Sequence, residues 1–379
     1  MRLSFFSFLT SCLFLISCQN NQTKNTAEIE QTADEAPLQW LTYEGTGTSA
    51  PKKKILLVSG DEEYRSEEAL PQLASILANH HGFDCTVLFS QDPEKPGIID
   101  PNYSFNIPGL EKLAEADLMI LFTRFRALPD EQMQHFENYL QAGKPLIAIR
   151  TATHAFFFKD TTHQWQHYGF NYKGEKEEWQ LGFGKLVLGE TWYTHHGHHK
   201  HQSTRGIIAP DATNHPITNG IENGAIWGPT DVYGIRMPLP DNGQPIILGQ
   251  TIDREDSFDE NDPYFGLKET DHKIATTNPA SKNPYNPNEP MPPIAWTKSY
   301  EIPNGKKGLS FTSTIGSSTD MRDEEVRRLF VNAVYHLLEM DVPEKAKVDL
   351  IGNYQPSAYN FQKDEYWDEK NLVISKLNE

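Results

Sequence analysis

The sequence predicts an α/β protein with a mostly parallel sheet that helices cover on both faces. Three observations support this prediction. Short, almost wholly apolar runs of strand length recur in the first half of the chain, amphipathic stretches separate them, and polar residues follow each run directly. The second half is richer in strand-like runs and contains one long segment without periodicity.

The first half of the folded region alternates predicted strands with predicted helices. The strands span 55–58, 83–89, 117–123 and 146–149, and the helices span 66–80, 110–114 and 129–141. Near-continuous apolar strands of this kind are typical of a sheet that is buried on both faces.

The second half contains predicted strands at 185–188, 206–209, 231–237, 246–250, 294–298 and 308–315. Residues 254–292 are rich in Asn, Asp and Pro, so we interpret them as a surface insertion of the kind that forms lids. A closing helix is predicted over 324–340 from its apolar stripe. The tail, 342–379, carries scattered aromatic residues and is expected to pack on the domain.

Composition excludes several classes of protein. The 379 residues include 34 Lys and Arg against 52 Asp and Glu, a net charge of -18 that would repel the phosphate backbone of a nucleic acid. A mean hydropathy of -0.59 excludes a polytopic membrane protein. The sequence has no GxGxxG, P-loop or GxSxG pattern, which argues against the usual nucleotide-binding and serine hydrolase sites.

The N-terminal residues predict export and a lipid anchor. Residues 1–17 have the character of a signal peptide, and the stretch that ends Ser17-Cys18 resembles a bacterial lipobox, in which Cys18 becomes the lipidated N-terminus. Residues 18–50 are expected to be a flexible linker to a domain over 51–341. The expected location is the bacterial cell envelope, with the membrane as a partner through Cys18. Cys85 remains in the folded part, where we expect it in the core.

Candidate site residues follow the ends of three predicted strands, where ligands bind in open parallel sheets. They are Glu62 and Glu63, Arg124 and Arg126, and Arg150, Thr151 and His154. His154 is the expected acid or base, with Glu62 or Glu63 as its partner carboxylate, and the arginines with Thr151 are expected to hold substrate oxygens. The alternatives are that the carboxylates favour a helix N-terminus and that the arginines only pair with them.

A histidine-rich segment, residues 195–201, holds five of the 14 histidines. His195, His196 and His198 are candidate ligands of a divalent transition metal, and His195 and His196 with Asp231 are candidates for substrate contact. Such tracts are also common in solvated loops, so both interpretations stay open and no cofactor is assigned.

Five motifs resemble a known family. ILLVSGDEEY (55–64), GKPLIAIRTATHAF (143–156), HPITNGIENGAIWGPTDVY (215–233), PIAWT (293–297) and GLSFTSTIG (308–316) occur in the order seen in ThuA-like, or trehalose utilisation, proteins. The resemblance covers roughly residues 53–340. It implies a class I glutamine amidotransferase-like, flavodoxin-like fold and action on a disaccharide or a keto-sugar derivative.

The sequence departs from related patterns at two positions. Arg150 stands where true amidotransferases carry their Cys, so amidotransferase chemistry is not expected. Many family members have a His after the final strand, where this chain reads Ile315-Gly316-Ser317.

Three hypotheses follow. The first is an enzyme that processes a small-molecule carbohydrate by acid/base chemistry, with Trp192, Trp227 and Trp296 as candidates to stack on sugar rings. The second is a non-catalytic carbohydrate-binding lipoprotein. The third is a metal-assisted sugar hydrolase or lyase at the histidine-rich segment. The oligomeric state is left unassigned.

Overall fold

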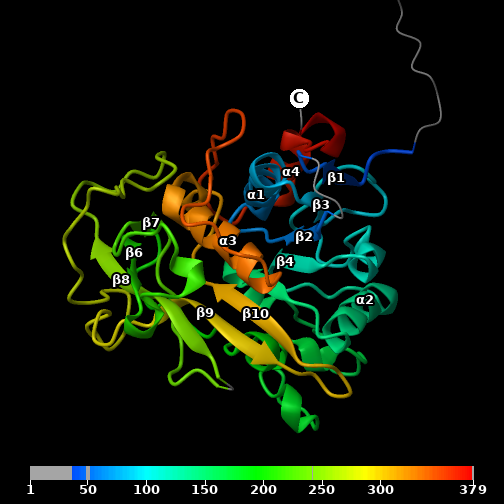
Figure 1. Cartoon of the computed structure of the whole chain (residues 1–379), viewed down its shortest axis with the longest axis horizontal. Helices are drawn as coiled ribbons and strands as arrows, with labels where there is room; N and C mark the ends of the chain where they lie inside the picture. The colour runs from blue at the N-terminus through cyan, green and yellow to red at the C-terminus, as the bar shows by residue number, and fades with distance from the viewer. Residues whose placement is uncertain (1–35, 48–51, 241, 378–379) are drawn as a thin grey trace, which may run out of the picture. The chain divides into compact units, whose positions relative to one another are not determined.

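The computed structural model of the chain describes residues 36–47, 52–240 and 242–377, and those from Pro37 onward form one compact unit. Its strands are β1 (Trp40–Tyr43), β2 (Lys54–Gly60), β3 (Asp84–Phe89), β4 (Leu118–Thr123), β5 (Leu146–Ile149), β6 (Gln202–Ile208), β7 (Ile226–Gly228), β8 (Gln244–Asp253), β9 (Pro293–Tyr300) and β10 (Gly308–Ser313). They form one sheet in the order β1-β3-β2-β4-β5-β10-β9-β8-β6-β7 (Figure 1).

The middle strands β3, β2, β4, β5 and β10 run parallel and are buried on both faces. Along β2, Ile55 and Leu57 enter one hydrophobic cluster, whereas Leu56 and Val58 enter the other, because successive side chains of a strand point to opposite faces. Helices α1 (Ser66–His81) and α3 (Glu324–Leu337) cover the first face, and α2 (Asp130–Gln141) with the 3-10 helix η1 (Leu110–Ala114) covers the second (Figure 1).

The sheet as a whole is mixed, which corrects the prediction of a mostly parallel one. The pairs β1–β3, β10–β9, β9–β8, β8–β6 and β6–β7 are antiparallel. Residues 301–307 join β9 to β10 and are too few for the helical crossover that parallel neighbours need. Apolar runs predicted most of the strand positions, but the length of the connections sets the direction of each pair.

Two predicted strands take other conformations. Gly184–Leu188 form a short π-helix, η5, where a strand was predicted over 185–188. Residues 231–237 contribute only an isolated bridge, between Tyr233 and His195. In the second case backbone groups that a ladder would use have other partners: the Val232 carbonyl accepts from the N–H groups of both His196 and Gly197, and the Arg236 N–H donates to the Glu190 carboxylate.

The folded unit reaches beyond the boundaries expected from the sequence. Trp40–Tyr43 lie within the expected 18–50 linker but form the edge strand β1 beside β3. The 254–292 insertion contains no helix or named strand along its length, all of which the structure describes. The tail contains α4 (Asp364–Lys370) and buries the side chains of Tyr359 and Trp367.

The predicted signal peptide, the lipidated Cys18 and the first part of the linker lie outside the described residues. Among the helices that the structure does describe, none is long and apolar enough to cross a bilayer. Cys85 is buried in the core, as predicted, and burial raises the pKa of its thiol.

Candidate active site

The turn that follows β2 is fixed by the buried carboxylate of Asp61. One oxygen of Asp61 accepts hydrogen bonds from the backbone N–H groups of Glu63, at 2.9 Å, and of Tyr64. The other accepts one from the Thr151 hydroxyl at 2.6 Å. Such an Asx turn holds the backbone in one conformation, and this fixes the positions from which the Glu62 and Glu63 side chains project. Thr151, expected to contact substrate, is fully buried and holds Asp61 in place.

Two arginines that follow β4 bind Glu62. Arg124 Nη1 contacts Glu62 Oε1, and Arg126 Nη2 lies 2.9 Å from Oε2. Arg126 is fully buried and also donates to the Ser90 hydroxyl and to three backbone carbonyls. Arg126 was expected to contact substrate, but these bonds hold it in place against Glu62. Arg124 keeps 18% of its side chain exposed and lies 3.9 Å from Glu63, so it is the arginine of this pair that a ligand can reach.

Arg150 opens the 3-10 turn η2 (Arg150–His154) after β5 and has a φ of 46°, in the left-handed region. Its guanidinium lies between the rings of Tyr64 and Tyr233, 4.0 and 4.3 Å from their centroids. Nη2 lies 3.2 Å from Asp231 Oδ1, and the side chain is fully buried. Arg150 was expected to hold substrate oxygens, but these contacts show that it holds Asp231.

Asp231 lies at the centre of a chain of polar contacts. Its Oδ2 accepts from His195 Nδ1 at 2.8 Å, and its Oδ1 accepts from His199 Nδ1 at 2.9 Å. Because a carboxylate can only accept, both imidazoles carry a proton on Nδ1. The second nitrogen of His199, Nε2, lies 3.5 Å from Glu63 Oε1. Glu63, His199, Asp231 and His195 therefore form one chain, which we call the acid/base network.

The local environments give these groups different proton affinities. Burial opposes ionisation of Asp231, but the charges and hydrogen bonds of His195 and His199 outweigh it and hold the pKa of Asp231 below its usual range. Burial also opposes protonation of His195, but the neighbouring Asp231 carboxylate outweighs it and raises the pKa of His195. Burial, with the charge of Asp61, raises the pKa of Glu63 to about 7. A histidine with a raised pKa and a carboxylic acid with a raised pKa thus belong to one network, an arrangement suited to proton transfer.

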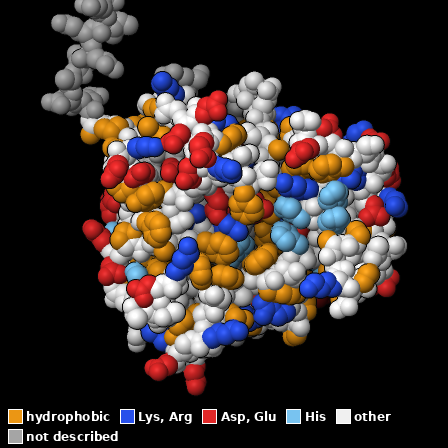
Figure 2. All heavy atoms as spheres, turned by 180° about the vertical axis from the view of Figure 1, so that it is seen from behind, with side chains coloured by type: hydrophobic (Ala, Val, Ile, Leu, Met, Phe, Trp, Pro, Cys, Tyr) orange, Lys and Arg blue, Asp and Glu red, His pale blue; other side chains and the backbone are white. Residues whose placement is uncertain are grey.

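His195 and His199 of the network line a surface depression of about 690 Å³, and Glu63 and Asp231 lie buried beside them. Residues 192–199 form one wall, and Asn278, Ala280, Ser281 and Tyr285 of the 254–292 insertion form the other. The side chains of His195 and His199 are 35% and 26% exposed. Figure 2 shows histidine side chains gathered on one face of the molecule with hydrophobic side chains beside them.

Comparison with known proteins identifies the family. The family model for ThuA, described as trehalose utilisation, matches residues 54–337. The chain belongs to the ThuA family. No curated protein matches it.

Solved structures similar to this ThuA-family chain include two described as ThuA-like. One, from Parabacteroides merdae ATCC 43184, is 15% identical, with 83% of this chain and 99% of that chain covered and a TM-score of 0.41. The other, from Bacteroides uniformis ATCC 8492, is 17% identical, with 79% and 96% covered and a TM-score of 0.43. At these values we transfer no residue roles from them.

His154, the predicted acid or base, lies in an aromatic environment behind the network. Its ring is 5.0 Å from that of Phe125 and 5.3 Å from that of Trp192, centroid to centroid, and the side chain is buried. Burial, reinforced by the positive charge of Arg124, lowers the pKa of His154 well below its usual range. His154 is therefore neutral at physiological pH. Glu63 was expected to be the partner carboxylate of His154, but it contacts His199 instead.

The predicted set of metal ligands is not the set that the structure brings together. His196 bonds the Pro287 carbonyl through Nε2 at 2.7 Å, and the His198 ring stacks on His201 at 4.2 Å, so neither joins His195. Among the residues that the structure describes, the group whose nitrogen and oxygen atoms could hold an ion is His195, His199 and Asp231, with ligand atoms within 4.8 Å of one another.

His199 is the network residue that the sequence analysis missed. It lies four residues after His195, but the segment is a turn and not a helix, so helical spacing does not explain why the two rings meet. Both approach Asp231 because backbone N–H groups of His196 and Gly197 bond the Val232 carbonyl at 2.8 and 3.0 Å. The only available signal was the local density of histidines.

The tail also reaches the site. Asn360 N–H donates to the Glu63 carbonyl at 2.9 Å, and the Tyr359 ring lies 5.4 Å from that of His199. The Phe361 ring lies 4.7 Å from the Arg124 guanidinium. These contacts place residues 359–361 against the network, a role that the scattered aromatics of the sequence did not specify.

Of the three tryptophans considered for sugar stacking, one lines the depression. Trp192 is partly exposed there. Trp296 is fully buried and donates to the Leu188 carbonyl at 2.7 Å, and Trp227 is buried as well. Of the three tryptophans, Trp192 is therefore the one that can contact a ligand bound in the depression.

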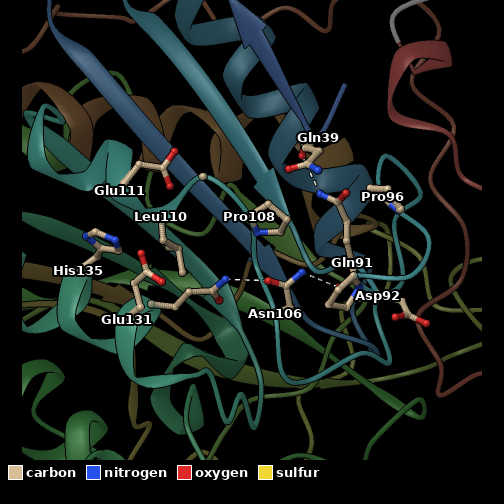
Figure 3. Close-up of a pocket in the computed structure, with 13 residues that line it drawn as sticks. Gln39, Gln91, Asp92, Pro96, Asn106, Pro108, Leu110, Glu111, Glu131 and His135 are labelled. Atoms are coloured by element: carbon tan, nitrogen blue, oxygen red, sulfur yellow. Dashed lines mark hydrogen bonds between the residues drawn. The ribbon is translucent and has the colours of Figure 1, made fainter. Parts of the chain in front are cut away.

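A separate pocket of about 330 Å³ lies beside the end of β3 (Figure 3). Its amide side chains bond one another or nearby backbone: Gln91 donates to the Gln39 carbonyl, Asn106 to the Gln91 carbonyl and Gln132 to Asn106 Oδ1, at 2.7 to 2.9 Å. None of the network residues lines it. We therefore place the candidate active site at the depression and not at this pocket.

Proposed function

We propose that this protein is an enzyme that processes a disaccharide or keto-sugar derivative by acid/base chemistry. The observation that supports this function most strongly is the acid/base network, in which a buried carboxylate orients two histidines and one of these faces a second carboxylate at 3.5 Å. The family description, trehalose utilisation, supports a carbohydrate as the substrate.

We further propose that the parallel half of the sheet is flavodoxin-like. In chain order its strands are β2, β3, β4, β5 and β10, and their spatial order is β3-β2-β4-β5-β10. This corresponds to the order 2-1-3-4-5, in which ligands bind at the carboxyl ends where the order reverses, between the first and third strands. Here that position is β2 next to β4, which are followed by Glu62 and Glu63 and by Arg124.

The reaction that fits these groups is elimination from a glycoside oxidised at C3. Glu63 removes the proton from C2, which the neighbouring carbonyl acidifies, and a C1–C2 double bond forms as the C1–O bond breaks. The departing oxygen takes a proton from His195 and leaves as an alcohol. In this reaction Arg124, whose Nε lies 3.9 Å from Glu63 Oε2, stabilises the negative charge that develops on the carbonyl oxygen. No oxidant is consumed, because the substrate is already a ketone.

The test uses trehalose and glucose, each in native form and oxidised at C3. We expect release of glucose from C3-oxidised trehalose and exchange of the C2 hydrogen with deuterated solvent, both followed by NMR. Glu63→Gln is expected to lower kcat by about 10²–10⁴-fold. Glu131→Gln, which changes an exposed carboxylate on α2, is the matched control. Binding of these sugars without exchange or cleavage would instead support a non-catalytic carbohydrate-binding protein.

A second candidate is metal-assisted sugar chemistry, favoured by the convergence of His195, His199 and Asp231. Two histidines and one carboxylate suit a divalent transition metal, which would polarise a substrate carbonyl. The test is the metal content of tagless protein purified without nickel, together with its activity after exhaustive chelation. Near-stoichiometric metal, with activity lost on chelation and restored by one ion, would favour this candidate; activity that survives chelation would exclude it.

We also propose that the protein is lipid-anchored in the cell envelope through Cys18. The lipobox-like sequence before Cys18 supports this. Metabolic labelling with a fatty acid in a bacterial host should label the wild type but not Cys18→Ala. Equal labelling of both proteins would exclude Cys18 as the attachment site.

A further inference from the structure

The outer part of the depression is bordered by two aromatic side chains that the proposed reaction does not use. Tyr193 precedes the histidine-rich segment and is 46% exposed; Tyr285 comes from the 254–292 insertion and is 38% exposed. Both line the same depression as His195 and His199. The depression has a volume within the range of about 300–1,000 Å³ that is common for small-molecule sites.

Tyr285 is exposed but held in place. Its hydroxyl donates to the His196 carbonyl at 2.9 Å and lies 3.2 Å from His196 Nδ1. Asn278 Nδ2 also donates to the His196 carbonyl, at 2.7 Å, and His196 Nε2 bonds the Pro287 carbonyl. His196 thus joins three points of the insertion to the histidine-rich segment, so the ring of Tyr285 stays beside the network.

Tyr193 is held from its own side. The Arg236 guanidinium lies 4.4 Å from the centre of its ring. Arg236 is itself fixed by the buried carboxylate of Glu190, which accepts from its Nε at 3.1 Å and from its backbone N–H at 2.9 Å. A ring that is packed on one side and exposed on the other can offer its outer face to a ligand at little cost in conformational entropy.

Resting on the proposed function, we propose that Tyr193 and Tyr285 form a subsite for the second ring of a disaccharide derivative, while the reacting ring lies at His195 and Glu63. The apolar C–H face of a pyranose packs on an aromatic ring, and its hydroxyls bond polar groups, which the same walls supply. Trp192, whose ring centroid is 5.8 Å from that of His195, lines the same depression as the two tyrosines. The insertion therefore selects disaccharide over monosaccharide derivatives.

The test compares C3-oxidised trehalose with C3-oxidised glucose, with C2 hydrogen exchange as the activity common to both sugars. Tyr193→Ala and Tyr285→Ala are each expected to raise KM for the trehalose derivative by about 3- to 10-fold and to leave KM for the glucose derivative unchanged. Tyr285→Phe keeps the ring and loses only the hydroxyl, so it should retain affinity within about 3-fold. Phe105→Ala, an exposed aromatic outside the depression, is the control.

The outcomes distinguish failure of this inference alone from failure of the proposed function. If wild-type protein acts on both sugars and the tyrosine variants change KM for both equally, or for neither, the subsite is refuted while the proposed function stands. If Tyr285→Phe loses as much as Tyr285→Ala, the hydroxyl anchor and not the ring is responsible, and the stacking role of Tyr285 is refuted. If the wild type acts on none of the sugars, the proposed function and the subsite fail together.

Discussion

Replacing Asp231 by Asn tests whether one buried carboxylate organises the site. That carboxylate accepts hydrogen bonds from His195 at 2.8 Å, from His199 at 2.9 Å and from Arg150 at 3.2 Å. An amide nitrogen cannot accept, so at least one donor loses its acceptor, and the fully buried Arg150 loses its counter-ion. Breaking a buried ion pair from one side costs about 3–5 kcal/mol, and we expect the free energy of unfolding to fall by that order.

The same change should disable the network. Replacing the orienting Asp of a serine protease triad by Asn lowers kcat about 10⁴-fold, and we expect a loss of about 10²–10⁴-fold here. The pKa of His195 should fall, because the Asp231 carboxylate raises it.

The stability difference should depend on pH with a definite sign. The pKa of Asp231 is lower in the folded than in the unfolded state, so its contribution is present above the unfolded value of about 3.9 and is lost as the pH falls below it. The deficit of Asp231→Asn is therefore greatest near neutral pH and shrinks in acid.

Three measurements check this prediction: kinetics with C3-oxidised trehalose, urea unfolding at pH 7 and at acidic pH, and NMR titration of ¹³C-labelled histidines. Glu325→Gln, which removes a carboxylate 2.9 Å from the buried Arg328 on α3, should lose stability but keep kcat and the pKa of His195. An Asp231→Asn protein with wild-type kcat and an unchanged His195 pKa would refute the reasoning.

Three further predictions concern Glu67 in the first turn of α1, Arg126 and His196. Burial raises the pKa of Glu67 to about 8, so wild-type stability should fall as the pH rises from about 4.5 towards 8, and the stability of Glu67→Gln relative to wild type should increase by on the order of 2–4 kcal/mol between pH 5 and pH 8; the same difference at pH 5 and pH 8 in urea unfolding would contradict this. Arg126→Met leaves five acceptors without their donor and should lower the free energy of unfolding by about 3–5 kcal/mol; a loss below about 1 kcal/mol in urea unfolding would contradict the structural role of Arg126. His196→Ala should speed amide hydrogen exchange over residues 278–288 and raise KM for the disaccharide derivative, and unchanged exchange would show that other contacts hold the insertion.

Most of the secondary structure of the first half was predictable, because its signals are local. The strands β2, β4 and β5 and the helices α1 and α2 were recognised from apolar runs and helical spacing within a few residues of their observed bounds. The strand predicted over 185–188 failed because a four-residue apolar run fits a buried helical turn equally well. The mixed direction of the sheet was missed because it depends on the connections between strands.

The candidate site shows the same division. The rule that ligands bind at the carboxyl ends of strands selected Glu63, Arg124 and the region of Arg150. It could not show that Arg126 and Arg150 form ion pairs inside the protein. Their partners, Glu62 and Asp231, lie 64 and 81 residues away along the chain, respectively. Nor could it select His199 over His154, since both are histidines near strand ends and only burial and contact with Asp231 distinguish them.

The sequence by itself determined the family, the α/β class and the edge of the sheet that holds the candidate site, because each depends on short motifs and on periodicity along the chain. Only the tertiary structure decided which polar side chains hold one another and which face the depression. The physical reason is that hydrogen bonds, burial and proton affinity depend on distances in space. Asp231 became the centre of the site because folding brings Arg150, His195 and His199 to its two oxygens.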